Sequence, residues 1–281
     1  MKIFTINVGA NASHANSGLK SPIFPDNKFE FIPIDCDYYK SSEFITYKEL
    51  HSFNKTENKL TKYMPENWWD KKVHNDPDWE NMTYGDFCND KSRAARLKEV
   101  GKGDFLLFWS RLYKWDEGFV DKGNLCLIGF IKVEDVFKIE EGKISNGEEV
   151  FRKDRINKIP EQLRKNAHVQ AWIRGEDKNF WDGAWIFVGS KKNSIRFKKA
   201  VMLEWDWATK VFQDKEGNSW KRASNKGTEQ QRIGSYLRAC RCQLDSNTKE
   251  DGERLKELLK KIRKLNDVGP LQKSLQHPLS F

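Results

Sequence analysis

Two apolar runs bounded by glycines predict a β-hairpin between residues 103 and 138. Phe-Leu-Leu-Phe-Trp at 105–109 follows a turn with two glycines, and Leu-Cys-Leu-Ile-Gly-Phe-Ile at 125–131 follows a polar loop. Short apolar runs bounded by glycines are typical of buried strands. Gly129 lies inside the second run, where a glycine indicates a β-bulge or a close approach of another backbone. We therefore expect two paired strands with a distortion at Gly129.

Alternation and helical spacing predict the other elements. Residues 2–8 alternate as a half-buried strand does, and residues 28–34 read as a second strand with Pro33 near its end. A capping box at Thr228 and Gln231 predicts the start of a helix. Further strands are expected at 184–189 and 195–205, and helices at 47–53, 84–99, 160–169, 228–244 and 250–265. This mixture of elements predicts an α+β fold.

The order of motifs in the hairpin resembles the core of PUA-like barrels. These motifs are a Gly-Asp turn, an apolar strand that ends in an aromatic residue, a loop, and a strand containing Ile-Gly-Phe. The resemblance implies an α+β fold with a PUA-like mixed β-barrel core at roughly 100–205 and helical additions, including a C-terminal helical part at 228–266. We expect one domain over residues 1–281. PUA-like proteins include readers of modified bases, whereas a plain hairpin in another α+β fold is the alternative.

The charge of the chain favours a polyanionic partner without proving one. The 281 residues include 50 Lys and Arg against 41 Asp and Glu, which gives a net charge of +9. Five scattered cysteines argue against a disulfide scaffold, and we expect neither a signal peptide nor a long apolar span. No histidine pair has metal-ligand spacing, and no phosphate-binding glycine loop is present. We expect a cytoplasmic protein without a membrane contact, a metal or a cofactor.

Polar side chains follow the first predicted strand. The segment at 6–14 reads Ile-Asn-Val-Gly-Ala-Asn-Ala-Ser-His, and Ser-Pro-Ile-Phe at 21–24 and Phe-Glu-Phe-Ile-Pro at 29–33 come next. Asn-Ala-His stands much later in the chain, at 166–168. Together these segments resemble the nucleotide-modification-associated domain family of the third type along nearly the whole chain. Asp-Cys-Asp at 35–37 departs from the Pro-Glu type of ending expected there, which puts a role for a carboxylate after the second strand in doubt.

The family resemblance implies an association with DNA base-modification and restriction systems, with no assigned reaction. Within the matched segments, His14 and His168 are the histidines that could share a pocket for acid–base or base-edge contacts. In the alternative, each histidine satisfies a backbone carbonyl or lies at the surface. Catalytic candidates, if a reaction occurs, are His14, His168 and Ser13. The predicted base pocket contains Asn7, Asn11, Ser13, His14, Trp109, His168 and Trp172.

An aromatic and basic strand face is a second candidate surface. Trp109, Arg111, Tyr113 and Trp115 alternate with other residues and would share one face, which could stack a base and hold a phosphate. The alternative is a face packed under a helix. The predicted contacts to a nucleic-acid backbone are Arg111, Lys221, Arg222, Arg232 and Arg238.

These patterns support three hypotheses. The leading one is a nucleic-acid-associated protein of a base-modification or restriction and defence system that recognises a modified or flipped base, with DNA as the expected nucleic acid. The second is an enzyme that modifies a nucleobase or nucleotide through its histidines. The third is a non-catalytic subunit that binds other proteins of such a system.

Overall fold

A computed structural model gives the structure of the chain. It describes residues 1–10, 12–36, 44–54, 59–90, 92, 94–120, 122–175, 182–212 and 241–269. The side chains of residues 12, 13, 205 and 241–243 are outside this description.

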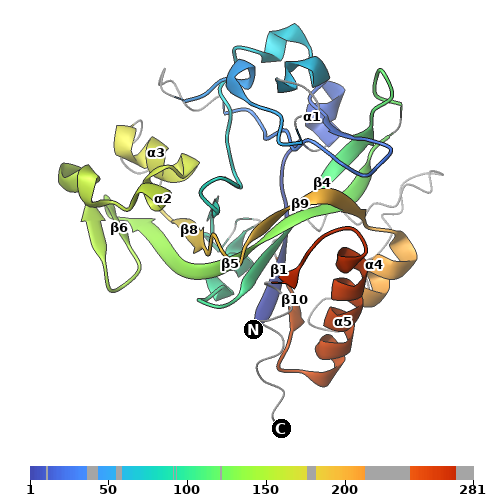
Figure 1. The fold of residues 1–281 in the computed structure, drawn as a ribbon. Helices are drawn as coiled ribbons and strands as arrows, with labels where there is room; N and C mark the ends of the chain where they lie inside the picture. The colour runs from blue at the N-terminus through green and yellow to red at the C-terminus, as the bar shows by residue number, and fades with distance from the viewer. Residues whose placement is uncertain are drawn as a thin grey trace.

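A large mixed sheet organises the molecule (Figure 1). At its centre β1 (Lys2–Asn7) runs parallel to β4 (Phe105–Lys114), which pairs antiparallel with β5 (Asn124–Glu140). The other strands are β2 (Ser21–Ile23), β3 (Thr83–Phe87), β6 (Lys143–Ser145), β7 (Val150–Arg152), β8 (Ala184–Gly189), β9 (Ile195–Met202) and β10 (Arg241–Asp245). The hairpin predicted from the apolar runs is therefore confirmed as β4 and β5.

The long strand β5 joins two parts of the sheet. Its first half pairs with β4 and β9, and its second half pairs with β8 and β6. The register slips opposite Gly129, as the glycine predicted. A Cβ atom at Gly129 would lie 2.5 Å from the carbonyl oxygen of Ile195 and 2.5 Å from the ring of Trp79. Only glycine permits this close approach of β9 to the bulged strand.

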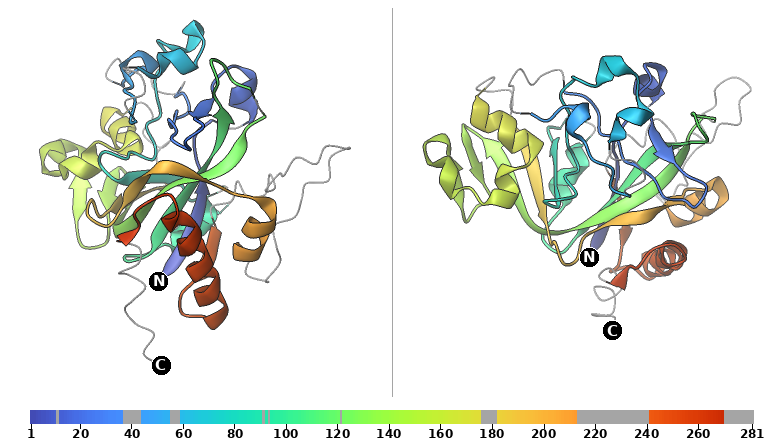
Figure 2. Two further views of the ribbon diagram at one scale, coloured as in Figure 1. Left: turned by 45° about the vertical axis from the view of Figure 1, so that its right-hand side comes forward. Right: turned by 45° about the horizontal axis from the view of Figure 1, so that its top comes forward.

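The sheet does not close into a barrel in the described residues. Among the strands, β10 pairs only with β1 and β9 only with β5, and β9 adds an isolated bridge to Lys28, so neither strand joins the other to close the sheet. Figures 1 and 2 show β5 as a long ribbon that carries the chain away from β1 toward β6 and β8. The α+β class is confirmed, but the expected mixed β-barrel core does not form a closed barrel in the described residues, because β5 diverges between two sets of partners instead of returning to the first strand.

Short helices cover the ends of the sheet (Figure 2). The α-helices are α1 (Ala12–Asn16), α2 (Glu161–Arg164), α3 (Ala167–Arg174), α4 (Trp205–Val211) and α5 (Lys249–Arg263), and the 3-10 helices are η1 (Tyr47–Glu49), η2 (Leu60–Tyr63), η3 (Glu66–Trp68), η4 (Ala95–Glu99) and η5 (Lys153–Lys158). α3 lies beside β3 and β8, whereas α5 packs on β10 and α4. None of the helices in the described part of the chain is long and apolar enough to cross a membrane.

Two predicted elements are wrong, two are partly right and one is largely untested. The helix expected at 47–53 is the short η1, and the helix expected at 160–169 is divided into α2 and α3. The helix expected at 84–99 is replaced by β3, which pairs with β8, and by the short η4. The strand expected at 28–34 forms only isolated bridges from Lys28 and Phe29. Most of the helix expected at 228–244 lies outside the described residues, but its end falls in strand β10.

Three hydrophobic clusters form the cores. The largest packs both faces of the β1–β4–β5 region and includes Trp109. A second cluster lies between α3 and the second half of β5, and it contains Cys36 and Trp172. The third gathers Leu19, Tyr47 and the residues of the 3-10 turns. The site described next borders the second cluster.

Candidate functional site

His168 is held by the buried start of α3. The Asn166 side chain caps this helix, since its Oδ1 accepts from the backbone N–H of His168 at 3.0 Å. Its Nδ2 atom donates to Oγ1 of Thr83 in β3 at 3.1 Å. Asn166 is completely buried. The Asn-Ala-His motif therefore docks α3 on β3 and fixes the position of His168.

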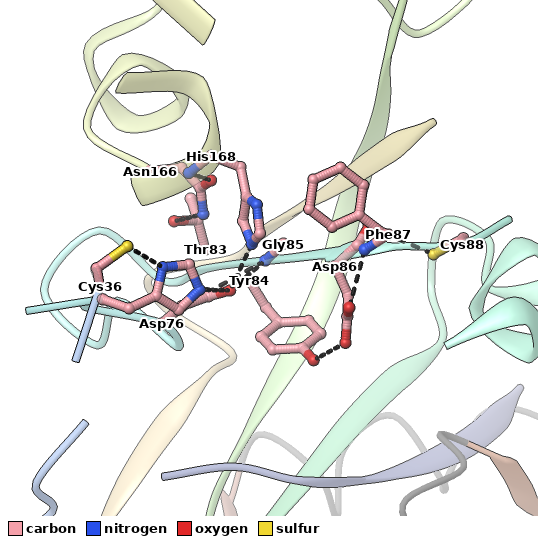
Figure 3. A network of polar contacts seen from close by, with 11 residues as sticks. Cys36, Asp76, Thr83, Tyr84, Gly85, Asp86, Phe87, Cys88, Asn166 and His168 are labelled. Atoms are coloured by element: carbon pink, nitrogen blue, oxygen red, sulfur yellow. Dashed lines mark hydrogen bonds and ion pairs between the residues drawn. The ribbon is translucent and has the colours of Figure 1, made fainter. Parts of the chain in front are cut away.

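His168 faces the buried carboxylate of Asp76 (Figure 3), and a second histidine, His74, lies beside both. Nε2 of His168 lies 3.3 Å from Oδ2 of Asp76, and Nε2 of His74 lies 3.7 Å from the same oxygen. The two imidazole rings meet edge to face, with centroids 4.8 Å apart. We call His74, Asp76 and His168 the His–Asp–His cluster.

Gly85 of β3 shapes the cluster in two ways. Its backbone N–H donates to both carboxylate oxygens of Asp76, at 3.1 and 3.0 Å. A Cβ atom at this position would lie 2.3 Å from Cδ2 of His168. The missing side chain thus lets the imidazole approach the strand, while the strand's own backbone orients the carboxylate.

Asp76 is a buried carboxylate with an altered acidity. Its side chain is 2% exposed. Burial raises the pKa of Asp76 to about 6, because the charged form loses its hydration, and the contacts to His168 and the Gly85 amide only partly oppose this effect. Buried groups with perturbed pKa values gather at functional sites more often than elsewhere.

A chain of contacts joins the cluster to the N-terminal segment. Sγ of Cys36 lies 4.0 Å from Nδ1 of His74. The preceding Asp35 lies beside His14, with 4.0 Å between Oδ1 and Nε2, and beside Lys71, with 3.4 Å between Oδ2 and Nζ. Backbone hydrogen bonds between segments 34–36 and 72–74 hold the two stretches together.

Two groups of contacts meet at the adjacent residues Asp35 and Cys36, and we call their members together the histidine line: His14, Asp35, Cys36, His74, Asp76 and His168. Its two ends differ in exposure. The His14 side chain is 25% exposed and the His168 side chain is 6% exposed. Near the outer end, Nζ of Lys71 lies 3.9 Å from the ring centroid of Trp68. The line therefore runs from a partly open, cationic end to a closed end in the interior.

The two predicted tryptophans lie in different cores. Trp109 and Trp172 are each 2% exposed, the first in the largest cluster and the second one helical turn after His168 in α3. Neither ring has an open face in this conformation, so their assignment to a base pocket stays a prediction. Asn7 ends β1 beside Trp109 in the strand pairing, and Arg111 donates from Nη1 to the carbonyl oxygen of Gly123 at 3.1 Å.

Several predicted site residues cannot be placed. Asn11 and the side chain of Ser13 fall outside the described residues, although the Ser13 backbone belongs to α1. The predicted backbone contacts Lys221, Arg222, Arg232 and Arg238 also lie outside them.

His74, Asp76 and Cys36 are not among the site residues predicted from the sequence. The sequence contains a partial signal for two of them, because His74 and Asp76 lie two residues apart shortly before strand β3. The Asp35-Cys36 pair was noticed only as a departure from the expected ending. In the structure, Asp35 lies beside His14 and Cys36 lies beside His74.

The fold and the site define an α+β protein built on an open, bulged sheet, with a buried His–Asp–His cluster between the sheet and a short capped helix. The chain belongs to the family described as nucleotide modification associated domain 3, which it matches over residues 2–255. Neither the curated proteins nor the solved structures contained a match. Membership in this family points to a role in a nucleotide modification system.

Proposed function

We propose that the protein recognises a nucleobase of a nucleic acid, with DNA the expected form, through the histidine line. The observation that carries the proposal is that the two segments with the family-like motifs, at 6–14 and 166–168, each contact the short stretch around Asp35 and Cys36. His14 contacts Asp35 directly, and Cys36 reaches His168 through His74 and Asp76. Imidazole and carboxylate groups can donate to and accept from base edges. Family membership supplies the context of a nucleotide modification system.

The outer end of the line is the place where a base would first be bound. His14 and Asp35 offer a donor and an acceptor there, and Lys71 adds a positive charge beside Trp68. A base in a duplex must leave the stack to reach such groups, and a modified or mismatched base does so at lower cost. This reasoning favours a modified or flipped base, within a modification or restriction and defence system, over unmodified duplex DNA. As part of this proposal, the β4–β5 hairpin is related to the core hairpin of PUA-like domains, which include readers of modified bases.

A chemical step on the base is the second candidate function. Its support is the composition of the inner cluster, since two histidines and a buried aspartate are more than base reading requires. The same site would then recognise the base and act on it.

The proposal is tested by titrating the full chain with matched duplexes and single strands, plain or carrying modified cytosine, thymine or adenine. Tighter binding of one modified base, lost in His14→Ala with unchanged thermal unfolding, is the expected result. Equal binding of every substrate would contradict it. The mass of each oligonucleotide after incubation separates the two candidate functions, because only the chemical step changes that mass.

A further inference from the structure

We infer that the His–Asp–His cluster binds one divalent transition-metal ion. One donor atom from each of His74, Asp76 and His168 lies within 4.8 Å of the other two. Zinc binds histidine nitrogen at about 2.0–2.1 Å and carboxylate oxygen at about 2.0–2.2 Å, so donors around one ion lie about 3–3.5 Å apart. The 3.3 Å and 3.7 Å separations from Asp76 are already near this range.

The three ligands come from two parts of the chain, since His74 and Asp76 share one segment and His168 belongs to α3. His74 pairs with Ile34 through its backbone N–H, Asp76 accepts from the Gly85 amide, and His168 sits in the capped first turn of α3. Ligands fixed by separate hydrogen bonds need little rearrangement when an ion enters. A small rotation of the imidazole rings would bring both Nε2 atoms to the ion.

The environment suits a cation. Asp76 is buried beside two aromatic nitrogen donors, and a buried carboxylate is costly unless a positive charge or a metal ion accompanies it. Cys36 contacts Nδ1 of His74, on the side of the ring away from Asp76. This contact makes Cys36 a positioning partner for His74, as outer-sphere groups are in known metal sites.

The ligand types limit which metal can bind. Two imidazole nitrogens and one carboxylate oxygen suit zinc, iron(II), manganese, cobalt and nickel, whereas magnesium and calcium prefer oxygen ligands alone. Three protein ligands also leave coordination positions for water or a substrate, as in catalytic rather than structural sites. The ligands come from residues 74, 76 and 168, which explains why no short metal motif is visible in the sequence.

Metal binding is measured on the full chain without nucleic acid. A negative result would therefore contradict the metal site without bearing on base recognition, and the reverse also holds. The protein is stripped with a chelator, and zinc is titrated by calorimetry. Cobalt(II) absorption then reports the coordination number, and X-ray absorption of the zinc-loaded protein reports the ligand types. We expect one equivalent of zinc, two imidazole ligands, and an increase in the thermal midpoint upon binding.

The variants identify the site. Asp76→Asn keeps the size and one acceptor oxygen, and His74→Gln and His168→Gln keep polar side chains, so each should fold and lose stoichiometric zinc binding. Cys36→Ala should weaken binding about 10–100-fold, as expected for a positioning partner. His51→Ala removes an exposed histidine outside the line and should bind as the wild type does. A folded wild type that binds no zinc, or zinc binding that survives all three ligand variants, would overturn the inference. If a ligand variant fails to fold, the X-ray absorption of the wild type decides.

Discussion

Gly85 is the residue whose identity most directly controls the site. Its amide orients Asp76, and the absence of a side chain leaves room for the His168 ring. A Cβ at Gly85 would meet the His168 imidazole, whose ring also contacts the rings of Phe87 and His74. The glycine therefore allows the His168 ring to lie close to β3 in the interior, next to the carboxylate of Asp76.

Gly85→Ala should displace His168 and lower the free energy of unfolding by about 1–3 kcal/mol, which is typical of overpacking in a core. Chemical denaturation and the NMR shifts of the His168 ring measure the two effects. Gly118→Ala is the matched control, because an added Cβ meets nothing within 4 Å there. An alanine at 85 that leaves both stability and the ring shifts unchanged would show that the contact is not tight.

Trp172→Ala separates packing from recognition at the residue scale. The ring is buried in the second cluster, so its removal should lower the free energy of unfolding by about 3–5 kcal/mol. Thermal or urea unfolding measures this loss. A stable variant with selective loss of base binding would instead support the predicted stacking role.

At the scale of elements, the spacing of apolar residues predicts those strands and helices whose formation depends on contacts close in the sequence. The β4–β5 hairpin, β1, β8, β9 and α5 followed from apolar runs and spacing. β3 did not, because Thr83–Phe87 becomes a strand through its pairing with β8, about a hundred residues later in the chain. The same limit applies to the site. His14 and His168 were selected from local motifs, whereas the places of His74 and Asp76 depend on the pairing of segments 34–36 and 72–74 and on the docking of α3.

Asn166→Ala tests this docking. The variant loses the cap of α3 and the contact to Thr83, and cap removal alone costs about 0.5–2 kcal/mol. We expect a loss at the upper end of that range, measured by urea unfolding, together with weaker base binding. Asn166→Asp keeps the capping acceptor and should restore part of the stability. Equal stability of the wild type and Asn166→Ala would contradict the assigned role of the cap.

At the scale of the whole molecule, charge and site contribute differently to binding. The net charge of +9 favours any nucleic acid, and this contribution should fall as salt rises, because binding releases counterions from the phosphates. We therefore expect the logarithm of the affinity for plain duplex DNA to fall linearly with the logarithm of salt concentration, as fluorescence anisotropy would measure. Weak affinity that does not change with salt would favour the third hypothesis, a subunit that binds other proteins.

The most direct test of base recognition is the ratio of affinities for a modified and a matched plain duplex, measured by competition at high salt. Screening suppresses the general attraction there, so the ratio isolates contacts to the base. The histidine line predicts a ratio above one for at least one modification in the wild type, and a ratio near one in His14→Ala. A ratio of one for every modification, or a preference that survives His14→Ala unchanged, would contradict base recognition through this line.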